Sequence, residues 1–373
     1  MNLLIVFTLI GVWELCKLEE VAKITMGQSP NSKNYTKNPN DYILVQGNAD
    51  IKNGKVVPRV WTTQLTKQAE KGDLLLSVRA PVGDIGKTEY NVVIGRGIAG
   101  IKGNEFVFQQ LSKMKDNNYW ARYSTGSTFE SISSNDIRGA IFFIPEKIEQ
   151  ESIGLFLKNI DNFIVLHQRK LDQLKELKKA YLKAMFVSMN TKNNKVPKLR
   201  FTDFEGDWEQ RKLGNISKMY QPQTITGTEL LPSGYPVFGA NGYIGFYSEM
   251  NHENDQVTIS ARGEGTGTIN YVNGPVWITG NSMVINVNDF DINKRFLHAN
   301  LSSNSLKKYI TGGAQPQLTR DILTSVPIKL PNIFEQNKIG LFFKQLDETV
   351  NLHQNKLTQL KFLKKSYLQN MFI

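Results

Sequence analysis

The sequence has few of the residues that build metal sites and disulfides. It contains one cysteine, Cys16, and four histidines among 373 residues. One thiol cannot form an internal disulfide or a cysteine-cluster zinc site, and the histidines lack a metal-ligand spacing such as H-E-x-x-H. A lone thiol also fits a reducing compartment. We therefore expect a cytoplasmic protein without a metal centre.

The sequence also lacks a long apolar run. The most apolar stretch, MNLLIVFTLIGV at residues 1–12, is too short to span a bilayer. It resembles the apolar region of a signal peptide, but no basic region precedes it and no small-x-small cleavage site follows. We expect it to be a first β-strand or a start-site extension, and we expect no membrane partner.

Enzyme motifs are missing as well. The sequence has no G-x-x-x-x-G-K-[ST] phosphate loop, no Asn-Pro-Pro-aromatic set of an amino methyltransferase and no G-x-S-x-G elbow. Gly239–Gly245 is rich in glycine, but no strand-to-helix unit surrounds it. We predict no catalytic residues and no cofactor held by this chain, which leaves an enzyme of unrecognised type as a minor alternative.

What the sequence does have is positive charge. Its formal net charge is +11, and 40% of its residues are hydrophobic, which is enough to form folded cores. A basic protein favours a polyanionic partner, because lysine and arginine release the counterions condensed on phosphates. Charge alone leaves a nucleic-acid partner and a generic basic protein equally open.

An internal repeat is the main feature of the chain. Residues 149–186 and 335–372 align without a gap and are identical at roughly 23 of about 38 positions. Weaker matches lie upstream, such as Trp13-Glu14 with Trp208-Glu209. The chain is thus predicted to comprise an extension at 1–12, variable domains at 13–145 and 208–330, spacer helices at 146–186 and 331–373, and a linker at 187–207.

Each spacer segment carries an apolar stripe with steps of mostly three and four residues, which is typical of a near-heptad helix. At 1.5 Å per residue, a helix of this length is about 60 Å long and cannot bury its own stripe. The other copy is the economical partner, and an antiparallel pair would place the variable domains at opposite ends. The stripe of the first copy comprises Ile153, Phe156, Ile160, Phe163, His167, Leu171, Leu174, Leu177, Tyr181 and Met185.

The second stripe matches the first position by position. His167 and His353 lie on the predicted seam, where polar residues that fix the helix register are favoured over ligands or pH switches. The stripe of the second copy comprises Ile339, Phe342, Leu346, Thr349, His353, Leu357, Leu360, Leu363, Tyr367 and Met371.

The variable domains are predicted to be α+β, with mixed β-sheets and long loops. Short apolar runs are separated by glycine-rich turns and do not alternate regularly with helices, which argues against a doubly wound sheet. Short helices are expected around Glu105–Lys113 and Lys294–Ile310. The expected strands include Tyr42–Gln46, Asp73–Val78, Val92–Ile94, Val257–Ser260 and Met283–Val287.

The loops of both domains are rich in residues that suit base-edge readout. Arginine pairs bidentately with guanine, and asparagine and glutamine pair with adenine. Ordinary turn chemistry explains most of these residues singly, so the prediction depends on their number. The candidate DNA-binding residues are Gln28, Ser29, Arg79, Lys87, Arg96, Ser127, Gln223, Asn241, Arg262, Thr266, Asn281, Gln315 and Gln317. The basic linker Lys192–Arg200 either lies along the DNA backbone or is solvated.

Two diverged domains, each followed by a near-identical helix, resemble the specificity subunit of a type I restriction–modification system. The resemblance covers nearly the whole chain. It depends on the helix starts at Pro145 and Pro331, on L-H-Q-x-K-L at Leu166 and Leu352, and on L-K-K-x-Y-L at Leu177 and Leu363. The apolar N-terminus departs from the polar lead-in that such proteins usually have.

The resemblance implies a non-catalytic subunit that binds double-stranded DNA. Each variable domain would recognise one half of a bipartite site. The helix pair would set the spacer and dock two modification (methyltransferase) subunits, which restriction (motor-nuclease) subunits join. S-adenosylmethionine, ATP and Mg2+ would belong to those partners. The alternative is a coiled-coil scaffold without DNA readout, which a flat dependence of DNA affinity on salt would favour.

Overall fold

The chain folds into two compact units that each combine parts of both repeats. The computed structural model describes residues 12–123, 131–188, 194–263, 265–313 and 315–372. Unit 1 comprises Met1–His167 with Lys356–Ile373, and unit 2 comprises Gln168–Asn355. Of the predicted N-terminal strand or extension, residues 1–11 lie outside the described part.

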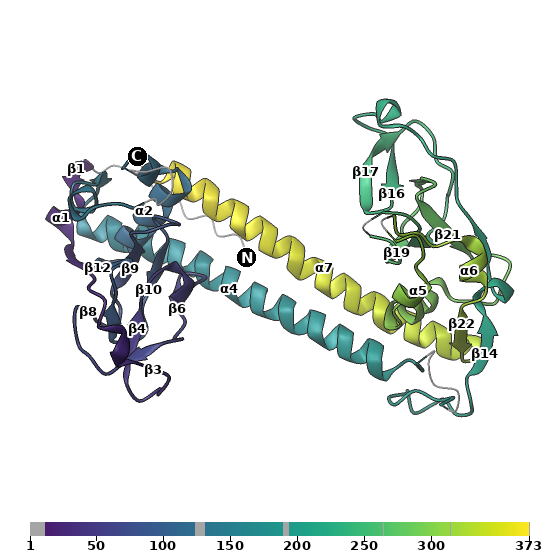
Figure 1. Cartoon of the computed structure of the whole chain (residues 1–373). Helices are drawn as coiled ribbons and strands as arrows, with labels where there is room; N and C mark the ends of the chain where they lie inside the picture. Colours follow the sequence, from purple (N-terminus) through teal and green to yellow (C-terminus); the bar gives the residue numbers. More distant parts are fainter. Residues whose placement is uncertain (1–11, 124–130, 189–193, 264, 314, 373) are drawn as a thin grey trace. The chain divides into compact units, whose positions relative to one another are not determined.

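Unit 1 is built on two larger sheets that mix parallel and antiparallel pairs (Figure 1). One has the order β2(Lys23–Met26), β12(Ile98–Lys102), β9(Leu74–Ser77), β10(Ile85–Lys87), β6(Lys55–Val56) and β5(Ile51–Lys52). The other has the order β3(Tyr35–Thr36), β7(Trp61–Thr62), β4(Tyr42–Val45), β11(Val92–Ile94) and β8(Gln68–Ala69). The strands predicted at 42–46, 73–78 and 92–94 are present as β4, β9 and β11, and each lies between two other strands of its sheet.

Unit 2 repeats this plan with fewer strands. A four-stranded sheet has the order β15(Lys218–Tyr220), β21(Ser282–Asn286), β18(Gln256–Ser260) and β19(Ile269–Val272). A three-stranded sheet has the order β17(Gly242–Tyr247), β16(Tyr235–Gly239) and β20(Trp277–Ile278). In both units the second sheet contains a parallel pair, β4 with β11 in unit 1 and β16 with β20 in unit 2.

A two-stranded antiparallel ribbon joins the two ends of each variable segment. In unit 1, β1(Glu14–Lys17) pairs with β13(Ile141–Ile144), and in unit 2, β14(Glu209–Lys212) pairs with β22(Pro327–Leu330). The first strand of each pair follows a tryptophan of the repeat, and the second precedes the helix proline. The chain therefore enters and leaves each variable segment through neighbouring strands.

The short helices cover the sheets. They are α1(Leu18–Val21), α2(Glu105–Asp116) and α3(Ser134–Arg138) in unit 1, and α5(Lys294–Ser303) and α6(Arg320–Thr324) in unit 2. Asn104 and Asn293 cap α2 and α5 by accepting hydrogen bonds from backbone N–H groups three residues on. The predicted helices at 105–113 and 294–310 are thus present, although the second ends at Ser303.

Two long helices, α4(Lys147–Ala184) and α7(Ile333–Asn370), correspond to the repeated segments. Both contribute to both units. In unit 1 the start of α4 runs antiparallel to the end of α7. There the Phe156 and Tyr367 rings meet edge to face at 4.9 Å, and Asp161 Oδ1 lies 2.6 Å from Lys364 Nζ. None of the helices among the described residues is long and apolar enough to cross a membrane.

Unit 2 repeats these contacts with the roles of the helices exchanged. The Tyr181 and Phe342 rings meet edge to face at 5.0 Å, and Lys178 Nζ lies 2.5 Å from Asp347 Oδ1. These residues occupy the positions in the repeat that match the pairs of unit 1. Each unit is therefore closed by the beginning of one long helix and the end of the other.

A phenylalanine directly after the end of each long helix inserts into the core of a unit. In unit 1 the Phe372 ring lies 5.0 Å from Phe106 and 6.4 Å from Trp13. In unit 2 Phe186 lies 5.6 Å from Phe296 and 6.1 Å from Trp208. This anchoring explains why the repeat keeps methionine and phenylalanine after the helical pattern has ended.

The predicted apolar stripe is wrong at three positions. Phe163, Leu177 and Leu363 are each exposed by more than two fifths, whereas Leu157 and Phe343 are buried. An ideal α-helix has 3.6 residues per turn, whereas a strict heptad assumes 3.5. The heptad positions therefore move around the helix away from its buried face, and residues next to them in the sequence are buried instead.

The linker packs against the start of α7. Arg200 donates hydrogen bonds of 2.8 and 2.7 Å to the carboxylate of Glu335, which is fully buried. Arg200 also donates to the carbonyl groups of Glu205 and Gly206. The sequence left two alternatives for the linker, contact with the DNA backbone or full solvation. Neither holds for Arg200, because its guanidinium group is bound by Glu335.

Breaking this buried ion pair should destabilise unit 2. Arg200→Met leaves the Glu335 carboxylate buried without its partner, which costs about 3–5 kcal/mol of unfolding free energy. Urea denaturation followed by circular dichroism measures the loss. The matched control is Asp203→Asn, which breaks an exposed pair with Lys338 in the same segment and should leave the midpoint nearly unchanged. Equal midpoints for the two variants would contradict the role given to the buried pair.

His298 on α5 makes unit 2 sensitive to acid. Its ring lies 5.8 Å from that of Tyr271. Burial is the main cause that lowers the pKa of His298 to about 4, and the charges of Lys178 and Arg295 add to it against the opposing charge of Asp347. The folded state therefore keeps this histidine neutral at pH values where the unfolded chain takes up a proton.

Stability should fall between about pH 6.5 and pH 4 because of this difference. Above pH 6.5 the contribution of His298 is complete, and it is lost as the pH drops toward the folded-state pKa. The variant His298→Gln should lose less stability than the wild type between pH 7 and pH 4.5 in urea denaturation. His353→Gln, which removes a half-buried histidine of α7, is the control. Parallel pH profiles for the wild type and His298→Gln would refute the assignment.

Candidate nucleic-acid interface

A corner at the end of β9 positions Arg79 in unit 1. Val78 is buried, its N–H donates to the Gly97 carbonyl at 2.9 Å, and its carbonyl accepts from the Ile132 N–H at 3.1 Å. Successive residues of an extended chain point to opposite faces. With Val78 fixed inward, Arg79 is exposed at the rim of the sheet.

Unit 2 has the same corner at the end of β18. The Ala261 N–H donates to the Asn281 carbonyl at 2.9 Å, and the Ala261 carbonyl accepts from the Leu318 N–H at 2.9 Å. Ala261 is buried and Arg262 is exposed. The motif Ser-Val-Arg of one repeat and Ser-Ala-Arg of the other therefore form one structure twice.

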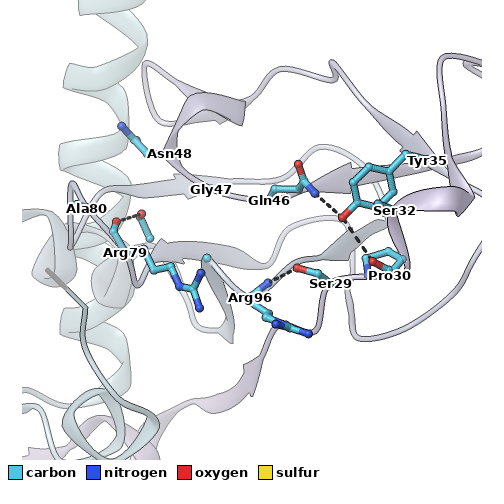
Figure 2. A pocket seen from close by; sticks show the side chains of 12 residues that line it. Ser29, Pro30, Ser32, Tyr35, Gln46, Gly47, Asn48, Arg79, Ala80 and Arg96 are labelled. Atoms are coloured by element: carbon cyan, nitrogen blue, oxygen red, sulfur yellow. Dashed lines mark hydrogen bonds between the residues drawn. The ribbon is translucent and has the colours of Figure 1, made fainter. Parts of the chain in front are cut away.

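In unit 1 the corner borders a hollow of about 500 Å³. Figure 2 shows Arg79 on the side of Asn48 and Arg96 on the side of Ser29. Arg96 lies in the turn that leads from β11 in one sheet to β12 in the other. The hollow is lined by Ser29, Pro30, Ser32, Tyr35, Gln46, Gly47, Asn48, Ser77, Arg79, Ala80, Arg96 and Gly97.

Hydrogen bonds fix the part of the hollow that is formed by Gln46 and Tyr35. Gln46 Nε2 donates to the Tyr35 hydroxyl at 2.7 Å, and the Gln46 N–H donates to Asp50 Oδ2 at 2.8 Å. Asp50 is buried and pairs with Arg59 at 2.7 Å. The amide of Gln46 is thus fixed in place, which favours selective hydrogen bonding to a ligand.

The hollow has a positive electrostatic character. None of the described residues that line it carries a negative charge. The guanidinium groups of Arg79 and Arg96 form no ion pair with any residue that the structure describes. Unpaired guanidinium groups beside amide and hydroxyl groups suit a ligand that combines phosphates with base edges.

In unit 2 two loops meet beside Arg262. The Thr266 hydroxyl lies 2.6 Å from the Gly263 carbonyl oxygen and 3.0 Å from the Pro316 carbonyl oxygen, and its one hydrogen is shared between these two acceptors. Arg262 and Gln317 form an isolated antiparallel bridge. The second loop also contains Gln315, whose N–H closes a turn onto the Gly312 carbonyl at 2.7 Å, and Gly312 has a φ of 92°, which favours glycine.

The structure brings together only part of the predicted DNA-binding set of unit 1. Ser29, Arg79 and Arg96 line the hollow, and Gln28 is exposed directly before it. Lys87 is not at the hollow; its Nζ lies 3.2 Å from Glu105 Oε2. Ser127 lies outside the described residues.

The predicted residues of unit 2 lie on neighbouring loops. Arg262, Gln315 and Gln317 are exposed and Thr266 is half-buried on the two loops that meet at Pro316. Asn241 is exposed close to Gly265 of the first loop, and Asn281 is exposed beside Ala261. The Gln223 carbonyl accepts a hydrogen bond from Trp277 Nε1 at 3.3 Å, which ties its loop to β20.

Sequence reasoning missed most of the residues that line the hollow, among them Tyr35, Gln46 and Asn48. The signal for Asn48 was present, because Val45–Asn48 aligns with Phe238–Asn241 and both segments end in asparagine. Tyr35 and Gln46 have no counterpart of the same type in the second repeat. Only the folded arrangement of β3 and β4 shows that they face the hollow.

The predicted helix-packing residues are all at least half-buried. The buried ones are Ile153, Ile160, Leu171, Leu174, Ile339, Leu357 and Leu360. The half-buried ones are Phe156, His167, Tyr181, Phe342, Leu346, His353 and Tyr367.

Both long helices also have exposed apolar residues at matching positions. In unit 1 these are Ile148, Leu155 and Leu166 of α4, and in unit 2 they are Phe334, Leu341 and Leu352 of α7. Each is more than half exposed. Steps of seven and eleven residues are close to whole numbers of turns, so each set lies along one face of its helix. Such aligned exposure is typical of an interaction surface.

Comparison with known proteins links both repeats to one family. The family model for the type I restriction modification DNA specificity domain matches residues 11–176 and again residues 205–361. The two matches together cover most of the chain.

Individual relatives agree with this match. The chain is 34% identical over 183 residues to the type I restriction enzyme MjaX specificity subunit of Methanocaldococcus jannaschii. It is 26% identical over 177 residues to the type I restriction enzyme EcoprrI specificity subunit of Escherichia coli. These alignments cover 47% and 46% of this chain and 43% of each relative, so the chain spans less than half the length of these curated relatives.

A solved structure shares the fold. The type I restriction–modification S subunit from M. genitalium superposes with a TM-score of 0.77, covering 100% of this chain and 98% of that chain, at 17% sequence identity. This likeness shows that the arrangement of sheets and long helices has been observed before.

Proposed function

The chain belongs to the type I restriction–modification DNA specificity family, and from this membership we propose that its two recognition domains each bind one half of a bipartite DNA site. We assign residues 13–145 and 208–330 to these domains, 146–186 and 331–373 to the spacer helices, and 187–207 to the linker. The observation that carries the proposal is that both units place an exposed arginine at the same corner of a duplicated frame, while the loops around it differ.

Two different recognition domains in one chain suit a bipartite, asymmetric site. Each wrong base pair costs roughly 1–3 kcal/mol, and the costs add for separated positions. The hollow of unit 1 supports contact with DNA rather than a purely scaffolding role, since its arginines have no acidic partner among the described residues. A scaffold would not require unpaired guanidinium groups at a frame position of both repeats.

The long helices would hold the two recognition domains at a fixed separation and so set the length of the unread spacer. Their exposed apolar faces support a second role as docking sites for two modification (methyltransferase) subunits. One such face, with Ile148, Leu155 and Leu166, lies in unit 1 and its repeat equivalent lies in unit 2. Two equal faces suit two copies of one partner.

Chemistry would reside in the partners. We propose that this chain is a non-catalytic cytoplasmic subunit, that the modification subunits supply S-adenosylmethionine-dependent adenine methylation, and that restriction (motor-nuclease) subunits bring ATP and Mg2+. What this chain would contribute is DNA sequence recognition and placement of the methyltransferase subunits.

Exchange of one recognition domain tests the proposal. Residues 208–330 are replaced by the corresponding domain of another family member, and the variant is co-expressed with its modification subunits. The exchange includes both strands of the ribbon β14–β22, so the incoming domain brings its own paired strands and the connections remain the same. Methylation mapping of the host genome should show one half-site changed, and the other half-site and the spacer unchanged. A change in both half-sites would refute modular recognition.

The docking faces give an independent prediction. Leu155→Glu places a charge on the exposed apolar face of α4 and should reduce the modification subunits bound per chain from two to one, as measured by native mass spectrometry. Leu155→Glu combined with Leu341→Glu should remove both. Lys158→Glu, an exposed position beside this apolar face on α4, is the control and should leave two subunits bound. Full binding by the double variant would rule out these faces as the docking sites.

A further inference from the structure

The two corners are alike beyond the arginine itself. In unit 1 the Ser77 N–H donates to the Asp84 carbonyl at 2.7 Å, and its carbonyl accepts from the Gly83 N–H at 2.9 Å. In unit 2 the Ser260 N–H donates to the Thr268 carbonyl at 2.9 Å, and its carbonyl accepts from the Gly267 N–H at 2.9 Å. The turns that follow differ in sequence, yet the chain reaches Arg79 and Arg262 along the same path.

An asparagine recurs in the same way at the second sheet. In the parallel pairs, Val45 lies opposite Ile94 and Phe238 lies opposite Ile278. The backbone hydrogen bonds that follow these pairs also match. The Gly95 N–H donates to the Val45 carbonyl at 2.8 Å, and the Thr279 N–H donates to the Phe238 carbonyl at 3.0 Å. Three residues after Val45 and Phe238 come Asn48 and Asn241, at equivalent places.

A glutamine recurs at the first sheet. Ile24 lies opposite Ile101 on β12, and Met219 lies opposite Ile285 at the equivalent place on β21. Four residues after Ile24 and Met219 come Gln28 and Gln223, and both are exposed. Each recognition domain therefore has one glutamine, one asparagine and one arginine at matching frame positions, which we call the shared trio.

Other polar residues near the same corners are not shared. The turn from the second sheet to the first has Arg96-Gly97 in unit 1 and Gly280-Asn281 in unit 2, at equivalent positions before Ile98 and Ser282. The counterpart of Arg96 in unit 2 is therefore Gly280, and the counterpart of Asn281 in unit 1 is Gly97. The interface divides into positions that the two domains keep and positions at which they differ.

This division separates two kinds of DNA contact, if each domain recognises its own half-site as proposed above. Two domains that read different bases cannot distinguish them through a residue that both possess. A shared residue contacts what every DNA segment offers, the sugar–phosphate backbone, and such contacts fix the register of a protein on the duplex. Bases are then read by residues at the unshared positions.

We infer that Arg79 and Arg262 are phosphate-contacting positioning residues, and that Arg96 and Asn281 at the unshared turn determine base specificity. This assignment departs from the prediction that all these arginines suit base edges. It rests on the proposed function. The frame explains it physically, because a guanidinium fixed at the same place in both domains meets the DNA backbone in the same way.

Lysine substitution separates the two roles. A lysine keeps the charge that a phosphate contact needs, but loses the planar fork that pairs with guanine. The variants are Arg79→Ala, Arg79→Lys, Arg96→Ala and Arg96→Lys, each tested as a complex with the modification subunits. Neither guanidinium pairs with a described residue, so thermal unfolding midpoints serve as the check that all four variants fold alike.

Arg79→Ala should bind a duplex with the recognised site and an unrelated duplex more weakly by the same factor, about tenfold. The slope of log affinity against log salt should fall by about 0.9, the value for one phosphate contact. The methylated motif should stay unchanged, and Arg79→Lys should restore most of the affinity. Arg262→Ala should reproduce this result from the other domain.

Arg96→Ala should instead relax the motif at one position of one half-site, and Arg96→Lys should fail to restore it. A motif relaxed by Arg79→Ala, or affinity that Arg79→Lys does not recover, would overturn the inference while leaving bipartite recognition intact. A wild-type complex with no sequence motif and a flat salt dependence would overturn the proposed function, and the inference with it.

Discussion

Two amphipathic helices that cannot bury their own apolar faces govern this structure. Each is too long for the recognition domain that precedes it, and each finds its complement in the other copy. The edge-to-face pairs Phe156–Tyr367 and Tyr181–Phe342, with the ion pairs Asp161–Lys364 and Lys178–Asp347, are one interaction made twice. The close identity of the helix repeats follows, because each copy must fit the other in both units.

The recognition domains are free to differ because the frame carries the fold. Ribbons join the two ends of each variable segment, and buried backbone bonds fix each arginine corner. The loops beyond these points make hydrogen bonds of their own, such as Gln46 with Tyr35 and Thr266 with Gly263, and they differ between the units although the path of the chain at the corner is the same. Within each recognition domain, some positions are therefore the same in both repeats and others differ. The two helices are nearly identical, whereas the two domains as a whole are not.

The helices and the main strands could be predicted from the amino-acid sequence, whereas only part of the nucleic-acid interface could. The helices and the main strands follow from local periodicity, which the folded chain obeys. The stripe failed at Phe163 and Leu177 because a straight helix drifts from a heptad over several turns. Lys87 pairs with Glu105, eighteen residues on, and Tyr35 meets Gln46 across two strands. These pairings arise from tertiary packing, which no local pattern encodes.

The completion of unit 1 by the end of α7 has a consequence for biosynthesis. The ribosome makes the first recognition domain early, yet its core includes Phe372, which packs on Phe106 at 5.0 Å and whose carbonyl accepts a hydrogen bond from Lys113 at 2.7 Å. Domains generally fold in the order in which they are synthesised. Here residues that are synthesised early complete their core only with residues synthesised after unit 2, so the nascent chain carries an unfinished core while unit 2 is made.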